Sequence, residues 1–108
     1  DNRAPQSLAG RTALIVGTGD IGLSVARFLA PFGMQLLGIA SSPRNLPPFR
    51  LVAGLDELPS LAVEADYLII NDDFTVALAQ FQALITSQHI RLARQAERHG
   101  QLLKDLLA

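Results

Sequence analysis

The chain has 108 residues, the usual length of one small domain. Hydrophobic residues make up 49% of it and charged residues 18%, which excludes a disordered charged tail and allows an apolar core. The net charge of −1 excludes a strongly basic nucleic-acid-binding surface. No apolar run has the length of a membrane span, no signal-peptide pattern opens the chain, and there is no cysteine for disulfides or thiolate metal sites. We therefore expect a soluble cytoplasmic domain.

The first part of the chain begins with a strand-like run and a helix-like segment. Residues 12–16 are continuously β-branched or aliphatic, which is typical of a parallel strand buried on both faces. Between residues 21 and 32, apolar side chains recur every three or four positions, as on one face of a helix. Gly33 fits the left-handed position after a helix end, and Pro31 should loosen the last turn. The pattern predicts a strand followed by a helix.

The following segments repeat this alternation. Residues 34–39 predict a second strand, and the proline-rich segment 40–49 predicts a loop. Residues 54–61 suggest a short helix with an acidic first turn, and 67–70 are a third strand-length apolar run. Together these segments predict an α/β fold, a partial doubly wound, Rossmann-like parallel sheet with the order βαβαβ over residues 11–71.

The last third of the chain has a different pattern. From residue 74 onward the apolar residues have helical periodicity, and no strand-like run is found among them. This predicts an all-helical C-terminal segment, with a short amphipathic helix over 101–108 at its end. We therefore divide the chain into a dinucleotide-binding half-domain over 1–71 and a helical tail over 72–108. The tail is expected to pack on the sheet or on a partner chain.

Two pairs of residues in the tail invite a metal-site interpretation that we do not favour. Asp72 and Asp73 could bind magnesium, but they directly precede the predicted helix and fit its N-cap better. His89 and His99 are ten residues apart, which does not match the i, i+4 spacing of a helical metal pair. We therefore predict no metal site in this chain.

The strongest motif is a G-x-G-x-x-G sequence placed between the first predicted strand and the first predicted helix. In this context Gly17 permits a tight turn, Gly19 lets the backbone approach a pyrophosphate, and Gly22 allows close packing of helix and strand. The helix then begins near Asp20 and Ile21, where free amides and the helix dipole can hold the anion. An ordinary glycine-rich turn is the alternative explanation.

The segment around this motif resembles a known family. LAGRTALIVGTGDIG at residues 8–22 and VARFLAPFGM at 25–34 are similar to the coenzyme domain of the D-isomer-specific 2-hydroxyacid dehydrogenases. LDEL at 55–58 and ADYLI at 65–69 match the next helix and strand of that domain. The glyoxylate/hydroxypyruvate reductase branch is the most similar. The resemblance covers residues 8–71 and implies a dinucleotide cofactor and reduction of a 2-oxo acid.

The resemblance does not extend past residue 71. The family continues with a proline-containing loop, further strands and a catalytic Arg, Glu and His, and no residue of this chain can be matched to that trio. The catalytic residues therefore remain unknown. A 2-oxo acid is expected as a substrate only if the rest of an active site is supplied from elsewhere.

The end of the second predicted strand bears on the choice of cofactor. NAD-binding domains place an acidic residue there, about 20 residues after the glycines, to bind the ribose 2′-hydroxyl. This chain has Ser41 and Ser42 at that place, followed by Arg44, whose guanidinium suits a phosphate. The sequence therefore predicts a preference for NADP over NAD.

Two functions from different classes remain open. The first is an NAD(P)-binding module related to NADP-dependent 2-hydroxyacid (glyoxylate/hydroxypyruvate) reductases, which lacks the catalytic residues. The second is a non-catalytic half-Rossmann domain that self-associates or binds a partner through its helical tail. In both cases the unpaired edges of a small sheet predict a homo-oligomer. The charge and the short apolar runs predict no nucleic-acid or membrane partner.

Overall fold

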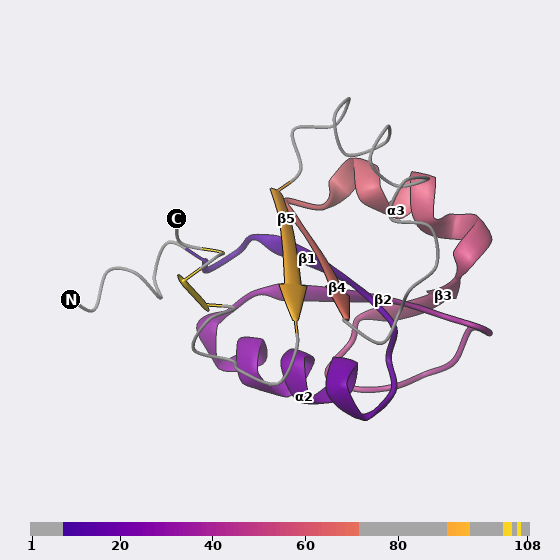
Figure 1. Ribbon diagram of the computed structural model, residues 1–108, viewed down its shortest axis with the longest axis horizontal. Coiled ribbons are helices and arrows are strands. Elements are labelled where there is room, and N and C mark those ends of the chain that lie inside the picture. Colours follow the sequence, from indigo (N-terminus) through magenta and orange to yellow (C-terminus); the bar gives the residue numbers. More distant parts are fainter. Residues whose placement is uncertain (1–7, 72–90, 96–102, 105, 107–108) are drawn as a thin grey trace.

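The computed structural model describes residues 8–71, 91–95, 103, 104 and 106, and these form an α/β structure around one parallel sheet (Figure 1). Neighbouring strands are hydrogen-bonded in the order β3-β2-β1-β4-β5, and every neighbouring pair is parallel. The predicted α/β class with a Rossmann-like parallel sheet is confirmed. The strands are β1 (Thr12–Val16), β2 (Gln35–Ala40), β3 (Leu51–Gly54), β4 (Tyr67–Asn71) and β5 (Arg91–Gln95).

Helical segments connect β1 to β2 and β3 to β4. After β1 the chain forms α2 (Asp20–Leu29), which continues into a 3-10 turn, η1 (Ala30–Phe32). Gly33 ends this segment with a left-handed φ of 82°, as the sequence predicts. Its N–H donates to the carbonyl of Ala30 at 3.0 Å. After β3 the chain forms η2 (Leu55–Glu57) and α3 (Leu58–Glu64). Among the helices that the structure describes, none has the length and apolar character to cross a membrane.

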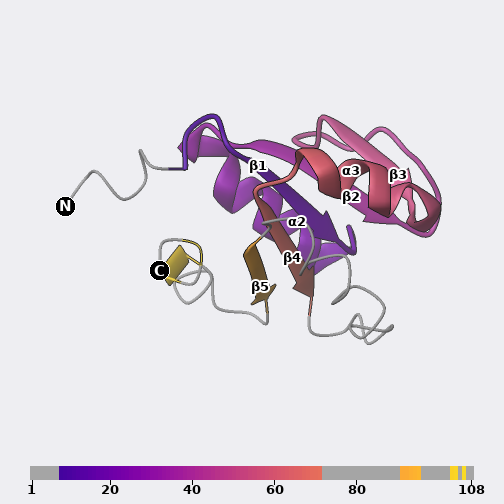
Figure 2. The same ribbon diagram turned by 90° about the horizontal axis from the view of Figure 1, so that it is seen from above.

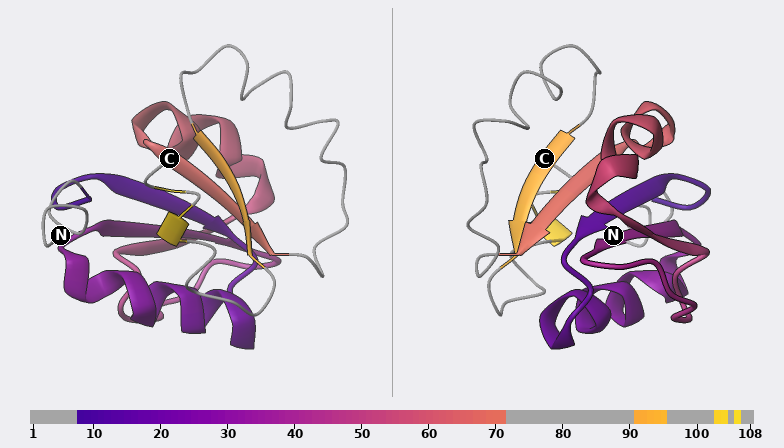
Figure 3. Two further views of the ribbon diagram at one scale, coloured as in Figure 1. Left: turned by 60° about the vertical axis from the view of Figure 1, so that its left-hand side comes forward. Right: turned by 90° about the vertical axis from the view of Figure 1, so that its right-hand side faces the viewer.

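The helices cover opposite faces of the sheet, α2 on one side and α3 on the other (Figure 3). Because successive strand residues point to opposite faces, β1 supplies both cores, with Ile15 on the α2 side and Leu14 on the α3 side. The α2-side core includes Leu8, Ala13, Val25, Leu29, Leu36, Val52, Tyr67 and Ile69. The α3-side core includes Val16, Leu37, Ile39, Ala53, Leu58, Leu61, Leu68 and Ile70.

One strand in the first part of the chain was not expected. β3 pairs in parallel with β2, Leu37 opposite Leu51 and Ala40 opposite Gly54, whereas the sequence pattern predicts a helix that begins at Gly54. The helical segment starts one residue later, at Leu55. β3 has only four residues and follows a proline-rich loop, so its sequence shows too little alternation of apolar and polar residues to predict a strand. It becomes a strand because the edge of β2 offers hydrogen-bonding partners.

The expectation of an all-helical segment from residue 74 onward is wrong at 91–95. These residues form β5, which pairs in parallel with β4 from Tyr67 opposite Arg91 to Asn71 opposite Gln95 (Figure 2). The edge of β4 offers a ladder of backbone partners, and this tertiary pairing overrides the local helical pattern. As far as the structure describes the chain, the sheet therefore has five strands in place of the three predicted.

Three described residues near the C-terminus lie on the α2 side of the sheet. Leu103, Lys104 and Leu106 are helical, which agrees with the short helix expected over 101–108 as far as the structure describes it. Leu106 is buried in the α2-side core, and Leu103 packs against that core. The expected helix near residue 74 lies outside the described residues.

Candidate functional site

The turn that follows β1 has a backbone conformation that favours glycine. Gly17 has a φ of 96°, in the left-handed region where a side chain would be strained. Its N–H donates to the carbonyl of Ile39 in β2 at 2.8 Å. The chain therefore leaves the sheet in a tight turn that stays bonded to the neighbouring strand.

The amino end of α2 begins directly after this turn. Gly19 is the N-cap residue, and no described side chain accepts a hydrogen bond from this end of the helix. The first bond within the helix runs from the N–H of Leu23 to the carbonyl of Gly19, at 2.8 Å. The amides of Asp20, Ile21 and Gly22 precede any helical acceptor, and the helix dipole adds positive potential there. Such an end can bind an anion.

Two of the motif glycines differ in their surroundings. A Cβ built on Gly19 would meet no described atom within 4 Å, so the space in front of the turn is open. Gly22 is buried within the first turn of α2, on the side that packs toward the sheet. An open position followed by a buried one is what the motif requires of an approach to a ligand and a close helix–strand contact.

A cleft of about 290 Å³ lies between the turn and the segment after β2. The turn contributes Gly17, Thr18 and Gly19 to its lining, and the other side is formed by Ala40, Ser41, Ser42 and Arg44. Five of the eight predicted site residues therefore line one cleft. The other three, Asp20, Ile21 and Gly22, lie in the adjoining first turn of α2.

Arg44 bridges the two sides of this cleft. Its Nη2 donates to the carbonyl oxygen of Thr18 at 3.0 Å and to the Thr18 hydroxyl at 3.1 Å. The backbone of Arg44 is held by a bridge to β3, in which its N–H donates to the carbonyl of Val52 at 3.3 Å. The guanidinium therefore stands at the mouth of the cleft, next to the glycine turn.

Thr18, the partner of Arg44, is not among the site residues predicted from the sequence. Its residue is only 4% exposed, and a Cβ on Gly38 would lie 2.7 Å from the Thr18 Cγ2 and 3.1 Å from the Phe49 ring. Thr18 thus rests on a strand position where only glycine leaves room. An isolated glycine inside a predicted strand indicates such a close approach, so Gly38 was the available signal.

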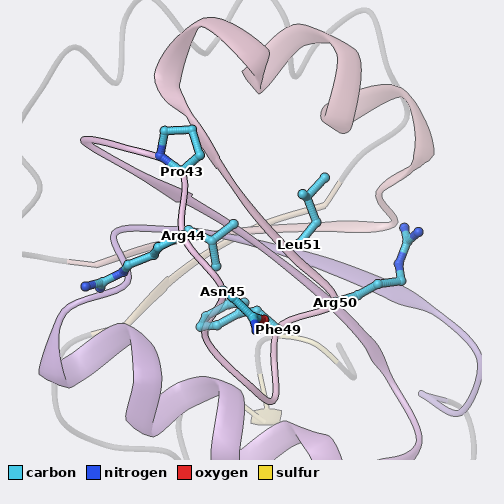
Figure 4. A pocket seen from close by; sticks show the side chains of 7 residues that line it. Pro43, Arg44, Asn45, Phe49, Arg50 and Leu51 are labelled. Atoms are coloured by element: carbon cyan, nitrogen blue, oxygen red, sulfur yellow. The ribbon is translucent and has the colours of Figure 1, made fainter.

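A second hollow, of about 370 Å³, lies on the other side of the same loop (Figure 4). Its lining includes Asn45, Phe49, Leu51 and Arg44. In Figure 4 the Arg44 side chain extends away from this hollow, toward the turn before α2, and Arg50 points in the opposite direction. Arg50 forms an exposed ion pair with Glu64, at 2.7 Å. Arg44 therefore borders both hollows but places its charge at the first.

The residues weighed as metal ligands, Asp72, Asp73, His89 and His99, lie outside the described part of the chain. Within that part, no group of three or more His, Asp or Glu side chains is arranged to hold a metal ion.

Comparison with known proteins gives one family match over most of the chain. The model of the D-isomer specific 2-hydroxyacid dehydrogenase NAD binding domain matches residues 1–96. A family protein of this kind from Aeromonas salmonicida subsp. salmonicida superposes with a TM-score of 0.62 at 23% identity, covering 84% of this chain and 39% of that one. A probable 2-hydroxyacid dehydrogenase from Rhizobium etli, solved in complex with NADP, has a TM-score of 0.61 at 10% identity and coverages of 82% and 39%. At these identities the structures share the fold.

A different likeness appears among curated relatives. Guanylate kinase from Methylococcus capsulatus is 47% identical over 58 residues, which is 54% of this chain and 28% of that protein. The chain therefore spans little more than a quarter of this relative, and about two fifths of the two solved dehydrogenases.

Proposed function

Because this chain belongs to the D-isomer specific 2-hydroxyacid dehydrogenase family through its NAD-binding domain, we propose that it binds a nicotinamide dinucleotide, with NADP preferred, in the cleft between the glycine turn and the end of β2. The observation that carries the proposal is the uncapped amino end of α2, open at Gly19 and faced by Ser41, Ser42 and Arg44 across one cleft. An anion site on one wall and a cation with hydroxyls on the other suit a molecule with phosphates at two places.

Each wall has a distinct role in this proposal. Gly17 and Gly19 let the backbone come close to the pyrophosphate, and the amides of Asp20, Ile21 and Gly22 donate to it. Across the cleft, Ser41, Ser42 and Arg44 would receive the adenosine ribose and its 2′-phosphate. No acidic residue follows β2 closely enough to bind a 2′-hydroxyl instead, since residues 40–44 are Ala, Ser, Ser, Pro and Arg.

The substrate class is also a proposal. In the complete enzyme, the cofactor would exchange hydride with a 2-oxo acid such as glyoxylate or hydroxypyruvate, the class suggested by the resemblance of residues 8–71. The hydride chemistry belongs to the cofactor, while this chain supplies its binding and orientation. A cation for the substrate carboxylate and a proton donor for its carbonyl must come from residues other than the motif described above.

Titration of the purified chain with NADPH, followed by cofactor fluorescence or calorimetry, tests the proposal. We expect saturable binding of NADPH and weaker binding of NADH. We also expect no NADPH oxidation above background with millimolar glyoxylate, because this chain has no matched acid at the carbonyl. If neither dinucleotide binds, the proposal is wrong. The non-catalytic half-Rossmann domain that associates through its C-terminal part then becomes the better description.

Arg44 allows a sharper prediction. Arg44→Ala should weaken NADPH binding by about 30-fold, because a charged hydrogen-bonding partner of the 2′-phosphate is worth roughly 2 kcal/mol. NADH, which has no 2′-phosphate, should lose no more than about twofold. Arg50→Ala is the matched control, since Arg50 is in the same loop region but pairs with Glu64 away from the cleft. Equal losses of both cofactors in Arg44→Ala would contradict a role in cofactor choice.

The likeness to guanylate kinases does not lead us to propose a phosphotransferase. A P-loop site requires G-x-x-x-x-G-K-[ST], in which the lysine reaches the phosphates. The glycine turn of this chain continues GTGDIGLS from Gly17, without lysine, and the single lysine of the sequence is Lys104. The kinase likeness therefore adds no nucleoside triphosphate site to the proposal.

We also propose that residues 1–71 form the dinucleotide-binding part, that β5 of the remaining segment 72–108 completes its sheet, and that the chain self-associates. The outermost strand β3 supports the last point, because Leu51 on it is 45% exposed and sheet edges favour pairing between chains. Sedimentation over a range of concentrations tests it, and a monomer at high concentration would contradict it.

A further inference from the structure

We propose that Thr18 is a positioning residue for cofactor choice, because its hydroxyl and carbonyl hold the Arg44 guanidinium at the mouth of the cleft. This inference rests on the proposed function and concerns a residue that the motif leaves unspecified, the first x of G-x-G-x-x-G. The contact directly links the glycine turn to the loop proposed to receive the 2′-phosphate.

The Thr18 side of the contact is held by packing. Thr18 is nearly fully buried, and its Cγ2 lies over the backbone of Gly38 beside the Phe49 ring. Rotation about χ1 would move this methyl out of the space that Gly38 leaves and would move the hydroxyl away from Arg44. The packing of the methyl group thus determines where the hydroxyl points.

The Arg44 side of the contact is held through its backbone. The N–H of Arg44 donates to Val52 of β3, an antiparallel bridge that fixes where the side chain leaves the loop. The side chain itself lies at an exposed position, where an arginine samples many rotamers in the absence of a partner. Thr18 therefore supplies the acceptors that select one of these rotamers.

The contact with Thr18 orders the Arg44 guanidinium and still leaves it able to bind a phosphate. Both contacts use Nη2, so the N–H groups of Nη1 and Nε can still donate to a ligand. An arginine that is already ordered loses less rotamer freedom when a phosphate binds, and this raises the affinity. The gain applies to NADP and not to NAD, because only NADP brings a phosphate to this side of the cleft.

The test compares two substitutions that separate the hydroxyl from the methyl group. Thr18→Val keeps the shape over Gly38 and removes the hydroxyl, whereas Thr18→Ser keeps the hydroxyl and removes the methyl. We expect Thr18→Val to lower the NADPH-to-NADH affinity ratio about fivefold, because a part-buried hydrogen bond to a charged group is lost. Thr18→Ser keeps the hydroxyl but loses the methyl group that orients it, so its ratio should lie between those of Thr18→Val and the wild type. Adenosine 2′,5′-bisphosphate measured against AMP should report the same change without the nicotinamide half.

Two further variants keep the inference open to refutation. In the Arg44→Ala background, Thr18→Val should not change the ratio further, since the two residues act through one contact. Arg44→Lys, measured alone, should lose part of the preference even if Thr18→Val does not fold, because a lysine cannot present the same planar set of donors.

The outcomes are distinct. An unchanged ratio in a folded Thr18→Val protein overturns the inference. So does a raised ratio, which would mean that Arg44 must leave Thr18 to bind the phosphate, and so do parallel losses of both cofactors. Failure of the wild-type chain to bind either dinucleotide is a failure of the proposed function itself.

Discussion

A Gly19→Val variant is expected to fold with the stability of the parent chain and to lose dinucleotide affinity by about 100-fold. Gly19 has φ of −71° and ψ of −158°, an extended conformation that a β-branched residue adopts readily. A Cβ at this position meets no described atom within 4 Å, so the protein itself has room for the new side chain. The side chain would instead fill the space in front of the amides of α2, where we propose that the pyrophosphate binds.

Two measurements on the same sample separate binding from folding. Chemical denaturation should give a free energy of unfolding within about 1 kcal/mol of the parent value, the size of an N-cap effect. Titration with NADPH should show the loss of affinity. Gly17→Ala is the matched control. It should lower the free energy of unfolding in addition to the NADPH affinity, because Gly17 has a left-handed φ of 96°. Retained NADPH binding in Gly19→Val would place the pyrophosphate elsewhere.

Gly38→Ala should have the largest effect on folding, a loss of about 2 kcal/mol, which is typical of an added methyl group in a packed core. The new Cβ would lie 2.7 Å from the Thr18 Cγ2 and 3.1 Å from two atoms of the Phe49 ring. Neither neighbour can move easily, since Phe49 is 5% exposed and Thr18 is in a turn bonded to β2. Thermal unfolding should show the midpoint lowered by roughly 10 °C.

Gly54→Ala is the control for this effect. Gly54 is also a strand residue, and a Cβ there would lie 2.9 Å from the Asp56 Oδ1. The neighbour in this case is the end of an exposed side chain, which can rotate away at little cost. The control should therefore lose less than about 0.5 kcal/mol. Equal losses in the two variants would mean that the packing of Thr18 and Phe49 on Gly38 does not limit stability.

The features that could be predicted from the sequence are those in which local pattern and tertiary role coincide. The strand 12–16, the helix after it and the left-handed Gly33 all have strong local signals, and the structure confirms them. The glycine turn is equally local, because strand, turn and helix start are consecutive in the chain. Five predicted residues from two distant segments then meet at one cleft because parallel strands end at the same edge of a sheet.

The elements that could not be predicted depend on a partner strand. β3 and β5 are only four and five residues long and carry few β-branched side chains, since Val52 is the single one in the two strands. Each exists as a strand because it hydrogen-bonds to the open edge of β2 or β4. A one-dimensional pattern does not contain that edge, so the helical periodicity around Leu92 was misleading.

The Thr18–Arg44 contact could not be predicted for a related reason. The two residues are 26 positions apart, and the motif treats residue 18 as free to vary. Only the turn geometry at Gly17 and the space over Gly38 bring the threonine hydroxyl to the guanidinium. The sequence suggested Arg44 by its chemistry, but the partner that orients it is a property of the fold.

The two-sided burial of β1 also has a consequence for how the sheet avoids misfolding. Leu14 and Ile15 are both fully buried, on opposite faces, so a chain that paired one residue out of step would still cover apolar side chains on each face. Hydrophobicity alone therefore penalises such an error weakly. The penalty comes from hydrogen bonds at the two ends of β1. At one end the N–H of Thr12 donates to the Asp66 carboxylate, and the N–H of Asp66 donates to the carbonyl of Thr12. At the other end the N–H of Gly17 donates to the carbonyl of Ile39. A shift of β1 by one residue would break both sets of hydrogen bonds, so these bonds favour the register in which Gly17 and Gly19 form the turn before α2.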